Sequence, residues 1–228
     1  MSYKKLDMLS VIPGRYDVWR ASVLFSPLRY FWQLLLASKK RLPVSSSIWI
    51  INRQILLEKL GGFASFKDEV RPEASIAFQL SGSYACFVSN STLGVSYEKK
   101  WRSQAETSRR LLYPMSGGIW WKAAGALIIL FFLNVPALML FSGLFIGWTE
   151  IQVMGLWFLF VHMGLYGVYT SYVWRHNWWL GALLWPVVIM QELVLYITSV
   201  VGYARHTITW KGRSLAASTR NDRVVIDE

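Results

Sequence analysis

The chain has 228 residues, of which 54% are hydrophobic, and it carries 24 Lys and Arg against 13 Asp and Glu. The positive surplus lies in the first half, since residues 1–114 hold 17 basic against 8 acidic side chains and the remainder holds 7 against 5. The single cysteine, Cys86, excludes an internal disulfide. Residues 120–204 carry so few formal charges that a water-soluble surface is excluded over that stretch. These charges are Lys122, Glu150, Arg175 and Glu192.

The first 44 residues are predicted to form an N-terminal segment with one helix at a membrane surface. Residues 1–20 show no secretory signal, because Lys4 and Lys5 are not followed by an apolar run. Residues 21–40 alternate apolar and basic character and lead into a Lys-Lys-Arg cluster, which predicts an amphipathic helix lying on an anionic bilayer. A core helix with a solvated end fits the same pattern, and both interpretations stay open here.

Residues 45–118 are predicted to form a small mixed α/β region. The β-rich "IWII" at 48–51 predicts a strand, and the helix that follows is expected to end at the glycine pair 61–62. A short helix is expected over about 73–80, followed by a strand in "SYACFV". The charged stretch 98–114 predicts a helix that leads to the membrane, with a break at Pro114 and a hinge over 115–118.

Three apolar stretches of about 20 residues each are long enough to cross a bilayer core. They cover residues 123–147, 151–174 and 178–201. The third stretch carries Pro186, Gln191 and Glu192 near its middle, and a carboxylate at that depth costs about 2.5–3.5 kcal/mol on insertion scales. We therefore expect the third segment to be kinked, re-entrant or turned toward a polar cavity.

Positive side chains beside the apolar segments predict which side of the membrane each part faces. Basic residues precede the first segment, and Arg175 with His176 lies in the second connection, so the soluble half of this integral membrane protein is predicted to face the cytoplasm. The tail, residues 205–228, is basic as well and favours the same side. Because three full crossings would place the tail on the other side, we favour a third segment that turns back.

The order of these elements carries a resemblance to a known family. A strand, "NRQILLEKLGGF", an acidic helix, "GSYACFVS" and a Gln- and Arg-rich helix running into apolar segments together resemble the second half of membrane-bound family 2 glycosyltransferases, especially those like ceramide glucosyltransferase. The tail stretch "HTITWKGRSL" resembles the Trp-Arg-Gly-Arg element that follows the last hydrophobic segment in many of these enzymes. The likeness covers residues 45–215.

The resemblance implies a fold and a division of the chain. It implies the α/β C-terminal half of a GT-A-like glycosyltransferase, with an acceptor-side region over 45–118. An α-helical membrane bundle of about three hydrophobic segments follows over 119–204, and a basic cytoplasmic tail closes the chain at 205–228.

The resemblance also implies roles for individual residues. Glu73 falls at the position of the catalytic base. The family motif Gln-x-x-Arg-Trp falls on residues 104–108, where Gln104 matches and the Arg and Trp do not. The nearest substitutes on that helix and the matching part of the tail complete the implied substrate-binding set, which is Trp101, Gln104, Arg109, Arg110, Trp210, Lys211 and Arg213.

Each of these residues also has a structural interpretation. Glu73 can serve as a solvated charge at a helix N-terminus. Arg109 and Arg110 can anchor the first apolar segment on the positive side of the membrane. Trp210 can anchor the tail at the membrane interface, and Lys211 and Arg213 can contact lipid headgroups. The Gly pair 61–62 ends a helix whatever the function.

The family holds its nucleotide sugar with a divalent metal bound by an Asp-x-Asp motif, because hard cations favour carboxylate oxygens. No two of the five aspartates stand at that spacing. The three histidines also lack ligand spacing. We therefore expect no cofactor or metal site in this chain, and Mg²⁺ or Mn²⁺ only together with a missing nucleotide-binding half.

Two functional hypotheses of different classes remain. The chain is a glycosyltransferase (hexosyltransferase) fragment or subunit that transfers a sugar from a nucleotide-sugar donor to a membrane lipid acceptor, with a separately encoded nucleotide-binding half or as a truncated product. Alternatively, it is a non-catalytic membrane interaction or scaffold protein derived from that fold. A small transporter has Glu192 as its only support. Nucleic acid is not expected as a partner, since basic residues beside apolar segments favour anionic lipid or a phosphorylated donor.

Overall fold

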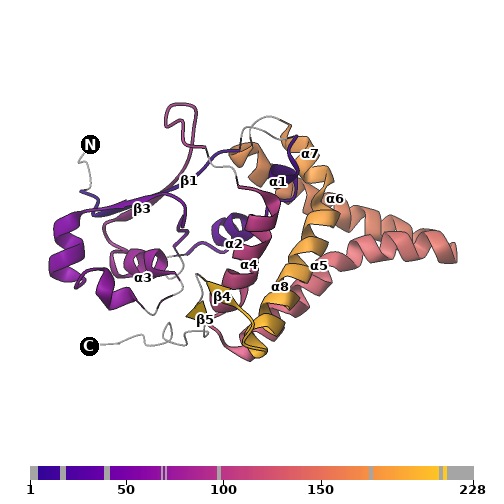
Figure 1. Cartoon of the computed structure of the whole chain (residues 1–228). Coiled ribbons are helices and arrows are strands. Elements are labelled where there is room, and N and C mark those ends of the chain that lie inside the picture. Colours follow the sequence, from indigo (N-terminus) through magenta and orange to yellow (C-terminus); the bar gives the residue numbers. More distant parts are fainter. Residues whose placement is uncertain are drawn as a thin grey trace. The chain divides into compact units, whose positions relative to one another are not determined.

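The computed structural model describes residues 5–15, 19–38, 42–67, 69, 71–96, 99–174, 177–210 and 213–214. By packing, the chain divides into two compact units (Figure 1). The sheet unit comprises residues 1–16 and 29–97, and the helical unit comprises residues 17–28 and 98–228. The four segments expected from the sequence were defined by function and membrane topology and not by packing. The division into two units therefore does not test them, and they stay predictions.

The sheet unit contains a small mixed sheet of three strands. These are β1 (Met8–Ile12), β2 (Trp49–Ile51) and β3 (Tyr84–Val88), in the order β2-β1-β3. β1 runs antiparallel to β2 and parallel to β3. The strands β2 and β3 lie where the sequence predicts them, whereas the central strand β1 was not predicted.

Short helices and turns complete the sheet unit. They are α2 (Arg29–Leu35), the π-helix η1 (Ile55–Lys59), the 3₁₀-helix η2 (Phe63–Phe66) and α3 (Pro72–Gln79). Gly61 and Gly62 separate η1 from η2 with φ angles of 70° and 74°, a region that favours glycine. The hydrophobic core is formed by Met8, Val44, Leu56, Phe66, Ile76, Ala77 and Leu80.

The helical unit is dominated by four long helices. They are α4 (Trp101–Met115), α5 (Trp120–Ile146), α6 (Thr149–Val173) and α8 (Trp185–Ala204). Two short helices belong to the same unit, α1 (Ala21–Leu24) and α7 (Trp178–Leu183). A two-stranded hairpin of β4 (Thr209–Trp210) and β5 (Arg213–Ser214) follows α8.

Three helices of the described chain are long and apolar enough to cross a membrane. They are α5, α6 and α8, and they identify the chain as a membrane protein. The first two match the predicted apolar segments. The third predicted segment is interrupted at Leu184, so that α7 and α8 are separate helices. Pro186 explains the break, because its fixed φ and missing N–H suit the first turn of a new helix.

The single helix expected over 21–40 is instead two short helices, α1 and α2, in different units. Pro27 lies between them, and it disfavours helical backbone at the residue before it. The alternation of apolar and basic residues was therefore not the sign of one continuous amphipathic helix.

The helix predicted to break at Pro114 continues to Met115. Pro114 has no N–H to donate to the carbonyl oxygen of Arg110, four residues earlier. The hydroxyl of Tyr203 in α8 donates to that oxygen at 2.7 Å. The partner helix thus supplies the hydrogen bond that the proline cannot make.

The helices α5 and α6 form a tightly packed hairpin. A Cβ atom added at Gly155 in α6 would lie 2.9 Å from both the nitrogen of Leu140 and the oxygen of Pro136 in α5. Glycine is therefore needed where the two backbones approach this closely.

Candidate functional site

A polar pocket lies in the helical unit where α4 meets the chain that follows α8. It has a volume of about 520 Å³. One wall comes from α4 and the residues before it, and the other from the start of the tail hairpin. The lining residues are Lys99, Ser103, Glu106, Thr107, Arg109, Arg110, Thr207, Ile208 and Thr209.

Hydrogen bonds from α8 fix the part of α4 that carries the two arginines. The hydroxyl of Ser199 donates to the carbonyl oxygen of Arg109 at 2.5 Å and accepts from the N–H of Tyr113 at 3.1 Å. Together with the bond from Tyr203 to Arg110, this ties the backbone of both arginines to α8. The side chains of both arginines thus line the pocket from a stretch of backbone that α8 holds in place.

The opposite wall exists because the chain reverses at the end of α8. His206 adopts a left-handed φ of 54°. The N–H of His206 bonds to the oxygen of Tyr203 at 3.1 Å, and the N–H of Thr207 bonds to that of Gly202 at 2.9 Å. This pair of bonds is a Schellman motif. Ile208 then packs over Gly202, where a Cβ would lie 2.5 Å from its Cδ1 atom.

The pocket combines cations and hydroxyl groups with one carboxylate, that of Glu106, which pairs with Arg102 at 3.4 Å. The ammonium group of Lys99 donates to Thr107 at 2.6 Å, and Thr107 donates to the oxygen of Ser103 at 2.8 Å. Arg109 is exposed and Arg110 is half-buried. Guanidinium groups bind phosphate or carboxylate oxygens in a bidentate manner, and neighbouring hydroxyls add further hydrogen bonds. The arrangement is suited to an anionic ligand.

The predicted residues Gln104 and Trp101 lie elsewhere on α4. Gln104 is 1% exposed, and its amide nitrogen donates to the oxygen of Ser22 at 2.6 Å and to that of Lys99 at 2.8 Å. The indole nitrogen of Trp101 donates to Gln191 at 3.0 Å. Both side chains therefore join α4 to other parts of the helical unit and do not line the pocket.

Two of the predicted tail residues, Trp210 and Arg213, lie in the short hairpin that starts at the pocket. Trp210 pairs with Arg213 across the antiparallel strands β4 and β5. Lys211 lies outside the described residues. Thr209, the residue before Trp210, lines the pocket together with Arg109 and Arg110.

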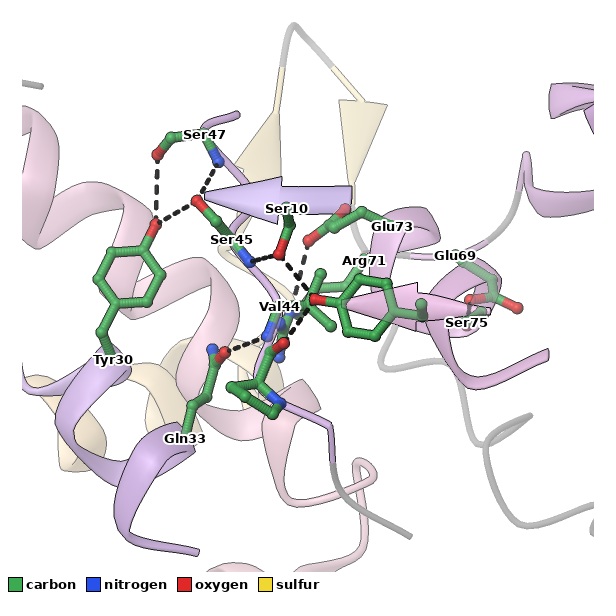
Figure 2. Close-up of polar contacts among 12 residues, drawn as sticks. Ser10, Tyr30, Gln33, Val44, Ser45, Ser47, Glu69, Arg71, Glu73 and Ser75 are labelled. Carbon is green, nitrogen blue, oxygen red and sulfur yellow. Dashed lines mark hydrogen bonds and ion pairs between the residues drawn. The ribbon is translucent and has the colours of Figure 1, made fainter. Parts of the chain in front are cut away.

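Glu73 lies in the sheet unit, in the first turn of α3 (Figure 2). It shares the buried face of that helix with Ile76 and Ala77, at the spacing expected for one helical face. Its Oε1 atom accepts from Nε of Arg71 at 3.5 Å, and the residue is 6% exposed. The interpretation of Glu73 as a solvated charge is therefore wrong.

A hydroxyl network surrounds the strands of the same unit (Figure 2). The hydroxyl of Tyr84 donates to the oxygen of Pro43 at 2.5 Å and lies 2.6 Å from Oγ of Ser10, which accepts from the N–H of Ser45 at 3.3 Å. Burial raises the pKa of the Tyr84 hydroxyl well above 10.0, and burial likewise raises the pKa of the Cys86 thiol. Both groups are thus held in their protonated forms.

Within the described ranges, no three His, Cys, Asp or Glu side chains lie close enough to hold a metal ion. The sequence interpretation did not identify the residues that build the pocket around the two arginines. Lys99 lay in no motif, Thr107 fell at the motif position where the family has Arg, and Thr207 lay in the tail stretch "HTITWKGRSL" without being singled out. Ser199 and Tyr203 offered a usable signal, because they are polar residues four apart on one face of an apolar helix.

Comparisons with protein-family models, with curated proteins and with solved structures found no match to this chain.

Proposed function

We propose that the chain is the acceptor-side and membrane half of a glycosyltransferase, which transfers a sugar from a nucleotide-sugar donor to a lipid acceptor. A nucleotide-binding half with the metal-binding aspartates would come from a separate chain. The observation that carries this proposal is the polar pocket, in which Arg109, Arg110 and the start of the tail hairpin meet.

The chemistry of the pocket fits the donor's phosphates. Sugar transfer leaves a negatively charged nucleotide diphosphate, whose charge must be offset as the bond to the sugar breaks. Arg109 and Arg110 offer bidentate donors for phosphate oxygens, and Thr207 adds a hydroxyl. Because α8 holds the backbone of both arginines, their positions are set before the ligand binds.

In this proposal Glu73 accepts the proton of the lipid's hydroxyl as it attacks the sugar. Its partner Arg71 holds the carboxylate in a fixed orientation. Arg213 and Lys211 add positive charge near the donor, and Trp210 anchors the tail at the membrane interface. The soluble half faces the cytoplasm, because basic residues flank the apolar helices on that side.

A non-catalytic scaffold is the second candidate, and one observation favours it. Gln104, the residue that matches the family's motif, is buried and used as a structural link between α4 and the segment at Ser22. A chain that kept this fold only for interaction would keep such links without needing Arg109 or Arg110.

The test begins with purification of the intact chain from its native membrane. The expected result is that a chain with an Asp-x-Asp motif copurifies and that the pair transfers sugar from a nucleotide sugar to lipid. Arg109→Gln and Arg110→Gln are each expected to raise the donor KM by about tenfold or more, the loss for one charged hydrogen bond of about 1.5–3 kcal/mol.

Arg53→Gln is the control, because Arg53 is exposed in the sheet unit and does not line the pocket. Unchanged donor KM in the Arg109 and Arg110 variants of an active pair would rule out the assigned role of the pocket. Purification without any nucleotide-binding chain or transferase activity would favour the scaffold.

A further inference from the structure

The helix α8 presents an apolar stripe on its outer surface. The stripe residues recur at intervals of three and four, so they share one face of the helix. Each is between 41% and 53% exposed within the described structure. They are Val187, Met190, Val194, Ile197 and Val201.

The opposite side of α8 is buried against protein along its length. Glu192 is fully buried and accepts from the N–H of Leu28 at 3.3 Å. The amide nitrogen of Gln191 donates to the oxygen of Phe25 at 2.9 Å. The polar residues that made this segment costly as a membrane span thus lie against protein inside the helical unit, where each accepts or donates a hydrogen bond.

The charged helix α4 runs parallel to α8 and beside it. Trp101 bonds to Gln191, and further along both helices Arg110 bonds to Tyr203. Between these two contacts, Arg109 of α4 bonds to Ser199 of α8, which lies as many residues after Gln191 as Arg109 lies after Trp101. Over this range, therefore, each turn of α8 has a turn of α4 beside it.

Because α4 packs along α8, an α8 that crossed the bilayer would carry α4 into the membrane with it. The outer face of α4 bears an exposed ion pair between Arg102 and Glu106, at 3.4 Å, and the exposed Arg109. Each Arg at the bilayer centre costs about 2.5–3.5 kcal/mol on insertion scales. A crossing α8 would place these charges, which lie beside its central turns, in hydrocarbon.

The helices α5 and α6 differ from α8, because they could cross the bilayer without carrying α4 into it. Figure 1 shows the tip of their hairpin projecting away from α4 and α8. At about 1.5 Å per residue, helices of 27 and 25 residues are about 40 Å long, enough to cross a core of about 30 Å. The side chains near the tip are strongly exposed, and Phe145 reaches 89%.

We propose that α8 lies along the membrane interface and does not cross it, so that α5 and α6 are the crossing helices. The occupant of the apolar stripe is the bilayer surface, at the boundary of acyl chains and headgroups. Two observations favour lipid as the occupant. The helix α8 packs against α5, whose outer surface is apolar. Arg102 and Arg109 lie on α4, beside α8, where anionic headgroups would be.

The inference does not depend on the reaction. An even number of crossings returns the chain after α6 to the side on which α4 lies. The tail hairpin and α4 then share one aqueous phase, which the pocket built from both requires.

The test measures depth along α8 in the full chain, reconstituted in vesicles of phosphatidylcholine and phosphatidylglycerol. A fluorophore is attached to a cysteine placed at Val187, Val194 or Val201 in a Cys86→Ser background, and quenching is compared between lipids brominated at shallow and deep positions. Similar shallow depths at all three sites are expected. A crossing α8 would instead place Val194 near the bilayer centre and Val187 and Val201 each about 10 Å from it, at about 1.5 Å per residue.

Two controls calibrate the measurement. A label at Phe132, which is 64% exposed near the middle of α5, should be quenched most by the deep bromine. A label at Arg102 should be quenched from water. If a cysteine at Val194 disturbs folding, Met190 and Ile197 replace it on the same stripe.

Three outcomes would overturn the inference. The first is a label at Val194 that the deep bromine quenches as strongly as it quenches the label at Phe132. The second is a stripe that lipid does not quench and whose labels on separate copies transfer energy to one another, which would assign it to a second copy. The third is labelling of cysteines at Ser214 and Arg102 from opposite sides of sealed vesicles.

Discussion

Ser199 bridges two peptide groups of a neighbouring helix, and this contact illustrates how single residues position the pocket. Its hydroxyl donates to Arg109 and accepts from Tyr113, one turn apart on α4. Tyr203 serves the carbonyl of Arg110, which Pro114 leaves without its usual partner. Both hydroxyls are buried, so water cannot readily replace them.

Ser199→Ala is expected to lower the free energy of unfolding by about 1–3 kcal/mol, because it leaves buried backbone groups without their partner. Thermal or denaturant unfolding in detergent measures this loss. Thr198→Ala is the matched control, since Thr198 bonds only to Leu195 within its own helix. An equal effect of the two substitutions would mean that Ser199 does not support α4.

Tyr84 makes the sheet unit sensitive to alkaline pH. Burial raises the pKa of its hydroxyl in the folded state, so the unfolded chain loses this proton first as the pH rises. The associated stability is complete below about pH 10, the ordinary tyrosine pKa, and declines above it. Burial of Cys86 acts in the same direction from about pH 9.

Hydrogen exchange of the amides of β1 and β3 is therefore expected to accelerate between neutral pH and pH 10–11 beyond its intrinsic pH dependence. Tyr84→Phe should weaken that extra acceleration, although the variant is less stable at neutral pH because it lacks the bond to Pro43. Extra acceleration of the same size in Tyr84→Phe would show that another group titrates.

At the scale of elements, the sequence predicts the two apolar helices of the hairpin, but it does not predict which other elements pack against one another. The segments at α5 and α6 are long apolar runs, which leave few alternatives. The strand β1 was missed because "MLSVI" is short and its pairing partners, β2 and β3, lie far along the chain. No local pattern shows that Gln104 bonds to Ser22 or that Ser199 bonds to α4.

The candidate site divides in the same way. The family pattern drew attention to Arg109 and Arg110, which line the pocket, and to three tail residues that are not among its described lining, where Thr207, Ile208 and Thr209 stand instead. It also selected Gln104, which the structure uses for packing. Residue type alone could not separate these cases, since each depends on which side of α4 faces a neighbouring helix.

Gly155→Val is expected to destabilise the α5–α6 hairpin, because a side chain there meets backbone atoms of Pro136 and Leu140 that cannot move aside. The expected cost is about 1–3 kcal/mol, as for other overpacked interiors. Gly164→Val, on the same helix, is the control, since its Cβ would meet nothing within 4 Å. Melting temperatures in detergent compare the two, and similar values would contradict the close packing.

At the scale of the whole molecule, the chain combines a hairpin of two long apolar helices, a helical layer with a cationic pocket, and a small α/β unit. The proposed division of labour assigns lipid handling to the first two and the catalytic base to the third. The donor's metal and nucleotide would be held by another chain, because no two aspartates here stand at the Asp-x-Asp spacing.

The most direct measurement of this account is sugar transfer to lipid by the chain in vesicles, with and without its copurified nucleotide-binding partner. We expect transfer only from the pair, its loss in Glu73→Gln, which removes the base with little change of shape, and its retention in Glu58→Gln, where the carboxylate is exposed on η1. Metal-dependent transfer by the chain alone, or full transfer by a pair that carries Glu73→Gln, would contradict the account.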